Sequence, residues 1–199
     1  MPHEYLMKEY ELCFAQLRFY DKRQESVLKY MLSLTSAVAT AEFAAYKLLG
    51  ATAGFFECEA LLSGLVFVAT LLLFLAMLQN RWYFVFVARQ LNAIRGYLMR
   101  VAAGGFKENQ LWTTDRPPLN PFSVHTFMLL GAALISSLFA GASAYAIQPA
   151  FGGVPCSETG AVTFLIVFVL EVWVGMKYLA SSDPKATGQG NPPQESKRR

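Results

Sequence analysis

Residues 61–78, LLSGLVFVATLLLFLAML, decide the fold class of this chain. The run carries no charge and is apolar around the whole circumference of a helix. A helix of a globular protein, in contrast, keeps a polar face. The run is also long enough to cross most of the hydrocarbon core of a bilayer. These features together indicate a transmembrane helix.

Three other runs have the same character. Hydrophobic residues make up 54% of the chain and charged residues 16%, and the charges fall almost entirely between the apolar runs. Only helices and closed barrels span a bilayer, and no segment here alternates with period two. We therefore predict an all-α integral membrane protein with four transmembrane helices, at residues 30–50, 60–80, 124–147 and 160–180.

The basic residues predict the orientation. Of the 17 Lys and Arg residues, all but Lys47 precede the first span, separate the second from the third, or lie from Lys177 onward. The two remaining connections, 51–59 and 148–159, carry Glu but no Lys or Arg. Because cytoplasmic loops hold the excess of Lys and Arg, we expect both termini and the long middle loop to be cytoplasmic in a plasma (inner) membrane.

Two cytoplasmic helices are predicted next to the spans. Residues 1–29 carry apolar side chains in steps of three and four, the pattern of a coiled-coil seam. Residues 81–103 form a basic amphipathic helix with Arg81, Arg89, Arg95 and Arg100 in one sector. The two helices either pair as an antiparallel hairpin, with the Arg sector facing outward to headgroups or a partner, or the second lies flat at the interface. A Pro-rich loop at 104–123 and a disordered tail at 182–199 complete the cytoplasmic parts.

Small residues in the third span favour close helix packing. Ala133, Ser137 and Gly141 recur at four-residue intervals, which lets helix backbones approach closely in lipid. This packing is either inside one protomer or between subunits of a homo-oligomer.

The candidate functional residues in the spans are two carboxylates. Glu42 and Glu171 both fall near the middle of the bilayer, where an ionisable residue marks an ion path, a proton relay or a polar pairing site. They either line a pore, serve as protonated hydrogen-bond donors between helices, or face lipid. Thr35 and Thr40 are the hydroxyl positions that we group with them.

Cysteine and histidine patterns bound the remaining chemistry. Cys58 and Cys156 both fall in the outer connections, so an oxidising outer compartment would allow a disulfide between the two hairpins. Only two histidines are present, and there is no CxxC, no phosphate-binding loop and no hydrolase motif. We expect no metal, no cofactor, no enzymatic activity and no direct nucleic-acid binding.

The layout resembles the SLATT-type membrane effectors that accompany bacterial nucleotide-signalling and antiphage systems. The resemblance covers roughly residues 1–100 and rests on a cytoplasmic helix, a transmembrane hairpin and the basic stretch NRWYFVFVARQLNAIR. It implies an effector that perforates or depolarises the membrane when a cytoplasmic signal arrives. Such families usually have two spans, and the hairpin after Pro117 departs from that pattern.

These observations favour an oligomeric inner-membrane pore or ion-conducting effector, controlled by a cytoplasmic protein partner. The alternative is a non-conducting anchor or scaffold that recruits the partner through the same cytoplasmic helices. A transporter ranks third, because no internal repeat relates the two halves of the chain.

Overall fold

The computed structural model describes residues 2–101, 122–154 and 156–181, and within them the chain is all-helical. The side chains of residues 2, 3, 99, 100 and 181 are not described. The predicted tail at 182–199 and residues 104–121 of the predicted Pro-rich loop lie outside the described residues. The four helices are α1 (Pro2–Leu49), α2 (Ala53–Val101), α3 (Val124–Ala150) and α4 (Ser157–Ser181).

Each of the two long helices joins elements that the sequence analysis treats separately. α1 runs through the predicted cytoplasmic helix and the first span, and α2 runs through the second span and the basic helix. Residues 53–59 of the predicted outer connection are helical, since α2 already begins at Ala53, and the point where the second span begins stays a prediction. Gly50 closes α1 with φ +61° and its N–H bonds Tyr46 O at 2.8 Å. Thr52 Oγ1 then accepts a hydrogen bond from the Phe55 N–H at 3.4 Å, so helix restarts at once.

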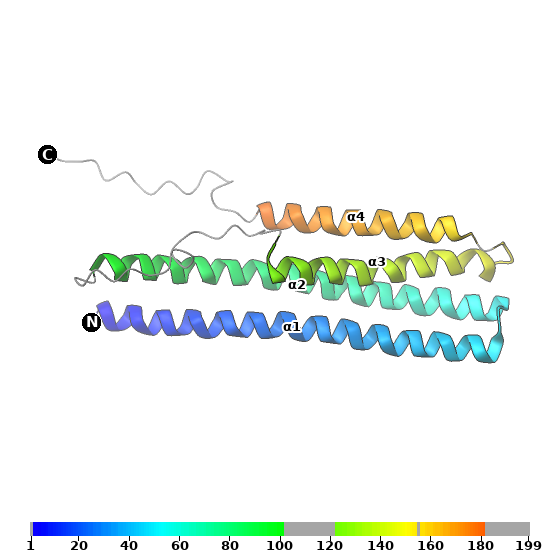
Figure 1. The fold of residues 1–199 in the computed structure, drawn as a ribbon, viewed down its shortest axis with the longest axis horizontal. Coiled ribbons are helices and arrows are strands. Elements are labelled where there is room, and N and C mark those ends of the chain that lie inside the picture. Colours follow the sequence, from blue (N-terminus) through cyan, green and yellow to red (C-terminus); the bar gives the residue numbers. More distant parts are fainter. Residues whose placement is uncertain (1, 102–121, 155, 182–199) are drawn as a thin grey trace.

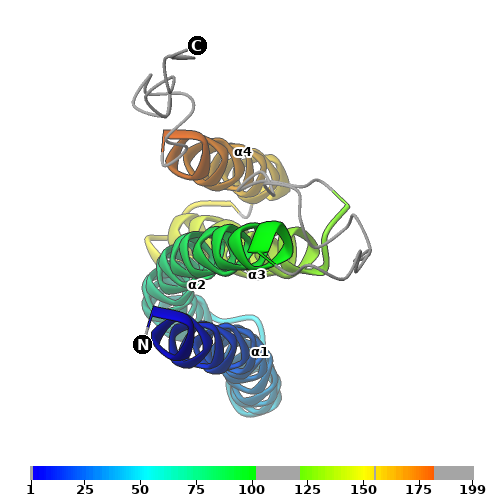
Figure 2. The same ribbon diagram turned by 90° about the vertical axis from the view of Figure 1, so that its left-hand side faces the viewer.

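The four helices lie nearly parallel to one axis, as Figure 1 shows. They follow the order α1, α2, α3, α4 across the molecule, and each packs mainly on its neighbour in the chain (Figure 2). The α3–α4 hairpin accompanies only the half of the α1–α2 hairpin that holds the turn at Gly50. The other half, from the N-terminus of α1 and the C-terminus of α2, projects beyond it; we call this part the stalk.

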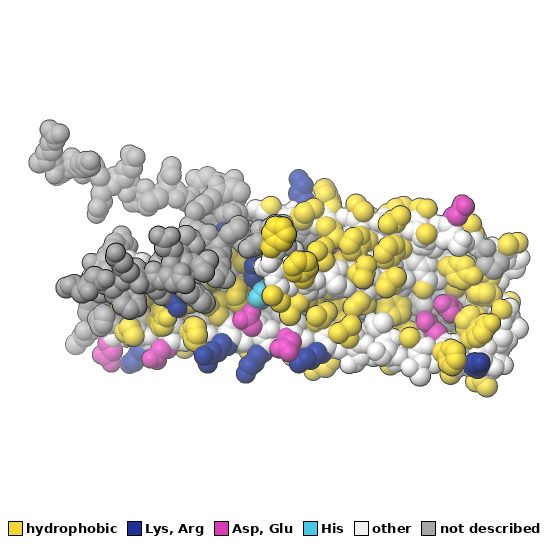
Figure 3. Space-filling model, in the orientation of Figure 1, with side chains coloured by type: hydrophobic (Ala, Val, Ile, Leu, Met, Phe, Trp, Pro, Cys, Tyr) yellow, Lys and Arg dark blue, Asp and Glu magenta, His cyan; other side chains and the backbone are white. Residues whose placement is uncertain are grey.

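Three of the described helices are long and apolar enough to cross a membrane, namely Ala53–Leu98, Val124–Ala150 and Ser157–Ala180. Within the described residues, the prediction of an all-helical protein with membrane-length apolar helices is confirmed for three helices. The α1 helix does not meet this criterion, because Glu42, Lys47 and several Ser and Thr residues lower the mean hydropathy of its apolar half. Figure 3 shows hydrophobic side chains over the four-helix part and charged side chains along the stalk.

The core has three parts along the axis. In the stalk, Cys13 of α1 packs with Val87, Leu91 and Ile94 of α2. The apolar seam of α1 and the apolar stripe of α2 are thus paired in antiparallel fashion, and the position of this pair relative to the membrane stays a prediction. A second cluster lies where α1, α2, α3 and α4 meet, around Met31, Met77 and Leu129. The third joins Val38, Val66 and Phe139 nearer the Gly50 turn.

Candidate functional site

A polar junction lies where the stalk meets the first turn of α3. His125 Nε2 of α3 is 2.8 Å from Asp21 Oδ1 of α1. The Arg81 side chain of α2 is buried, and its guanidinium lies 5.2 Å from the centre of the Phe84 ring, which in turn contacts His125. Burial raises the pKa of Asp21, and the positive charge of Arg81 partly offsets that effect.

Two buried amides continue the junction between α1 and α2. Asn80 Nδ2 donates to the Tyr20 carbonyl at 2.8 Å and to Gln24 Oε1 at 3.4 Å. Gln24 is the residue that interrupts the apolar seam of α1, and it is buried opposite Asn80. A buried polar pair in a helix seam fixes one register, because any slip leaves its polar groups without partners.

The Arg sector does not face outward as a whole, and that prediction is wrong for two of its members. Arg81 is buried at the junction. Arg95 donates to Tyr10 Oη of α1 at 2.8 Å and lies over the Tyr10 ring. The physical reason is that α1 covers this sector of α2, so the long Arg side chains bury their stems against it. Arg89 is half-buried, and the Arg100 side chain lies outside the described part.

Two carboxylates approach each other near the Gly50 turn. Glu42 Oε1 of α1 accepts a hydrogen bond from Ser63 Oγ of α2 at 2.9 Å. Glu59 lies one helical turn before Ser63 on the same face of α2, is half-buried, and is close enough for the Glu42 charge to act on it. Acidic side chains gather at this end of the molecule in Figure 3. Glu59 also lines a cleft of about 350 Å³ between α3 and α4.

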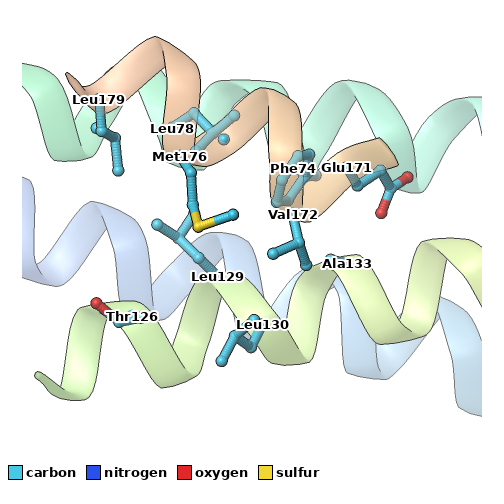
Figure 4. A pocket seen from close by; sticks show the side chains of 11 residues that line it. Phe74, Leu78, Thr126, Leu129, Leu130, Ala133, Glu171, Val172, Met176 and Leu179 are labelled. Atoms are coloured by element: carbon cyan, nitrogen blue, oxygen red, sulfur yellow. The ribbon is translucent and has the colours of Figure 1, made fainter. Parts of the chain in front are cut away.

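Glu171 occupies a separate position between α4, α3 and α2. Its side chain is only 6% exposed, and neither carboxylate oxygen makes a hydrogen bond. The buried hydroxyl of Ser136 on α3 lies next to this carboxyl, but the two groups do not have the geometry of a hydrogen bond. Figure 4 shows Glu171 beside the apolar side chains that line the cleft between these helices.

The structure therefore does not bring Glu42 and Glu171 to one site, since one lies between α1 and α2 and the other on α4. The two threonines also differ. Thr35 is half-buried and bonds the Met31 carbonyl at 2.8 Å, whereas Thr40 is exposed and bonds the Ser36 carbonyl at 2.8 Å.

The small residues of α3 are buried inside the protomer. Ala133 and Ser137 have no exposed surface, and Gly141 lies directly against Gly160 of α4. This burial favours packing of Ala133, Ser137 and Gly141 within one protomer over packing between subunits. Cys58 is exposed and Cys156 half-buried, and both are free thiols in this structure, so a bridge between them stays a prediction.

Sequence reasoning missed the junction and Glu59. Glu59 was assigned to a loop, although its spacing of four from Ser63 is a helical signal. Asp21 and His125 lie 104 residues apart in the chain, and nothing in either local pattern indicates their contact. Among the described residues, no three His, Cys, Asp or Glu side chains converge as metal ligands do.

Comparison with known proteins yields no relative. No protein-family model, no curated protein and no solved structure matches this chain. Its function is therefore argued from its own residues.

Proposed function

We propose that this chain is a four-span membrane protein that assembles into an ion-conducting oligomer with α1 lining the pore. The first support is the pairing of α1 with α2. The two helices run antiparallel along their whole length and are joined by a short turn at Gly50. If the apolar half of α2 crosses the bilayer, the adjacent half of α1 crosses with it.

The observation that carries the pore is the uncovered face of α1. This helix lies at the edge of the bundle and packs mainly on α2. At the depth of the three apolar helices, one sector of its exposed surface carries small and hydroxyl residues, namely Ser33, Ser36, Ala37, Thr40, Ala41 and Ala44, and the exposed Leu32 and Phe43 lie beside that sector. The exposed faces of α2 and α4 at that depth carry large apolar residues instead, such as Leu65, Leu72 and Leu165.

This contrast indicates different surroundings for the two faces. Leu, Val and Ile are the side chains that lipid favours, and small residues favour contact between helices or with water. The Ser36 and Thr40 hydroxyls donate to carbonyls of their own helix and keep lone pairs that can accept from water. A ring of α1 helices would bury this face around a central path and leave α2 and α4 toward lipid.

The stalk is the proposed receiver of the cytoplasmic signal. The excess of Lys and Arg supports a position for the stalk, with both termini, on the cytoplasmic side of the plasma membrane. Its outer surface exposes Tyr5, Leu12 and Phe19 at seven-residue intervals, so these three form one stripe on α1. A protein partner that covers this stripe would change the packing of α1, which continues without a break into the pore-lining segment.

The second candidate is a non-conducting scaffold, and the same stripe of Tyr5, Leu12 and Phe19 favours it. A scaffold needs this docking surface and needs no water beside Thr40. The SLATT-type resemblance and a role in antiphage defence stay predictions compatible with either candidate.

The experiment is thiol modification during flux. Thr40→Cys is introduced into a chain with Cys58→Ser and Cys156→Ser, leaving the buried Cys13. The full chain is placed in liposomes, and ion flux is measured before and after a charged, water-soluble methanethiosulfonate reagent is added. We expect the reagent to reduce flux by at least fivefold, because it adds a bulky charge to the pore wall.

The matched control is Leu72→Cys on the exposed face of α2, where the same reagent should leave flux unchanged. If Thr40→Cys is as unreactive as Leu72→Cys and the wild type conducts no ions even with its partner, the pore is excluded and the scaffold is favoured.

A further inference from the structure

The small and hydroxyl residues on the exposed surface of α1 are the middle of a longer face that carries lysines at both ends. Steps of three, four or seven residues keep side chains on one face of a helix. Exposed residues of α1 follow one another in such steps: Lys22, Lys29, Ser33, Ser36, Thr40 and Lys47. We call this surface the lysine-ended face. It includes the hydroxyl residues of the proposed pore wall.

Lys22 and Lys47 lie at the two ends of the part of α1 that would cross the bilayer. Lys22 follows Asp21, whose contact with His125 puts it level with the first turn of α3. Lys47 lies in the last turn of α1, just before Gly50. The helix between the two lysines is about 38 Å long, whereas the hydrocarbon core of a bilayer is about 30 Å thick. One ammonium group therefore lies just outside each side of the core.

The acidic residues of α1 do not cancel this charge. Between the two end lysines, α1 carries only Glu25 and Glu42. Glu25 pairs with Lys29 at 2.7 Å, so these two charges offset each other. Glu42 turns toward α2, where it accepts the hydrogen bond from Ser63. Within the described residues neither end lysine has an ion pair, so the lysine-ended face keeps a net positive charge.

We propose that the pore conducts small anions such as chloride in preference to cations, with Lys22 and Lys47 as the residues that set this selectivity. The proposal rests on the proposed function, in which α1 lines the pore. Repetition around the axis of an oligomer would turn each lysine into a positive ring, one at each mouth. Such rings of Lys or Arg favour anions in a pore, because they raise the local concentration of the opposite charge. The hydroxyls between the rings hold water and carry no net charge, so the lysines decide the sign of the permeant ion.

The test measures ion selectivity. The full chain is reconstituted in a planar bilayer of lipids without net charge, and the reversal potential in a KCl gradient gives the ratio of chloride to potassium permeability. We expect wild type to favour chloride by about threefold or more. This preference should decline as the KCl concentration rises on both sides, because the screening length falls from about 10 Å at 0.1 M to about 3 Å at 1 M.

Variants of the lysine-ended face should move the permeability ratio in opposite directions. Lys47→Glu should lower it by about threefold or more, whereas Lys47→Arg keeps the charge and should leave it unchanged. Glu25→Gln removes the ion-pair partner of Lys29 and should raise the ratio. If Lys47→Glu does not assemble, Lys22→Glu tests the other ring from a position in the stalk.

The matched control is Lys177→Glu on α4. Lys177 is exposed and lies over the Trp173 ring, so it is a lysine of the same chain that α1 does not carry. Because α4 lies toward lipid in the proposed oligomer, this charge reversal should leave the permeability ratio unchanged.

The outcomes separate the selectivity from the pore itself. Flux that is blocked by modification of Thr40→Cys but favours potassium would overturn the anion selectivity and leave the pore in place. A chloride preference that neither Lys47→Glu nor Lys22→Glu changes would do the same, and would show that these lysines reach lipid headgroups instead of the ion path. A wild-type chain that conducts no ions, even with its partner, would overturn both proposals.

Discussion

At the scale of single residues, burial and helix position give the thiols different chemistry. Burial, together with the negative charge of Glu9, raises the pKa of the Cys13 thiol. Cys156 precedes the first turn of α4, where hydrogen bonds from the Thr159 N–H and hydroxyl and from the Glu158 N–H lower its thiol pKa. The thiolate is the reactive form, so these two cysteines should react at very different rates.

We predict that, in reduced protein, Cys156 is alkylated by a maleimide at least tenfold faster than Cys13 at pH 7. Its rate should also reach its plateau at lower pH, since a lowered pKa makes the thiolate abundant earlier in the titration. Mass spectrometry of peptides after timed labelling measures both quantities. Thr159→Val removes one donor and should move the Cys156 profile to higher pH. Equal rates for the two thiols would contradict the prediction.

The sequence identified single polar residues but not their partners. Glu42 and Glu171 stand out in the printed sequence because they interrupt apolar runs. The hydroxyl that binds Glu42 is Ser63, which lies in an apolar run and carries no signal of its own. Arg81 and Arg95 were predicted to face outward because periodicity shows that they share a sector, but it does not show that α1 covers that sector.

At the scale of helices, α3 and α4 cross with their backbones in close contact, and a second glycine on α3 provides a matched control. A Cβ on Gly141 would lie 2.8 Å from the Gly160 carbonyl oxygen and 3.0 Å from Phe164 Cβ. These neighbours are backbone or the base of a side chain, so they cannot rotate away. The two helices can approach this closely only because both residues are glycine.

We predict that Gly141→Ala destabilises the protein by roughly 1–3 kcal/mol, because the helices must separate to admit the methyl group. Thermal unfolding in mild detergent measures the change. Gly131→Ala on the same helix is the matched control, since a Cβ there meets nothing within 4 Å. That change should be neutral or stabilising by up to about 1 kcal/mol through helix propensity. Equal destabilisation by both variants would show that the crossing is not tightly packed.

The helices themselves were largely predictable, because their periodicity is a local property. The seam of α1 and the apolar stripe of α2 have the spacing of paired helices, and the structure pairs them in the stalk. The ends were less predictable. Residues 51–59 carry the charges and aromatics expected of a connection, and only the absence of a strong helix breaker after Gly50 distinguishes them from one.

At the scale of the whole molecule, the position of α1 relative to the bilayer decides between three and four crossings. By length and hydropathy, α1 is not among the three helices apolar enough to cross a membrane. It nevertheless runs beside the apolar half of α2 (Figure 1). A segment too polar to face lipid on all sides can still span when protein covers its polar groups. Here α2 covers Glu42, through Ser63, and further copies of α1 would cover the face that carries Thr40.

We therefore predict that the two ends of the described chain lie on the same side of the membrane. Single cysteines are introduced as Gln16→Cys in the stalk, Ala180→Cys near the end of α4, and Val154→Cys in the α3–α4 connection, all exposed positions. The background carries Cys58→Ser and Cys156→Ser, and a membrane-impermeant maleimide is applied to intact cells, or to spheroplasts where an outer membrane surrounds the cell.

The expected pattern is labelling of Val154→Cys in intact cells or spheroplasts, and of Gln16→Cys and Ala180→Cys only after permeabilisation. The reason is that four antiparallel crossings return the chain to its starting side, and the Lys and Arg excess assigns that side to the cytoplasm. Three crossings would instead put Gln16→Cys and Ala180→Cys on opposite sides. That outcome would remove α1 from the bilayer, and with it the physical basis for a pore lined by Thr40.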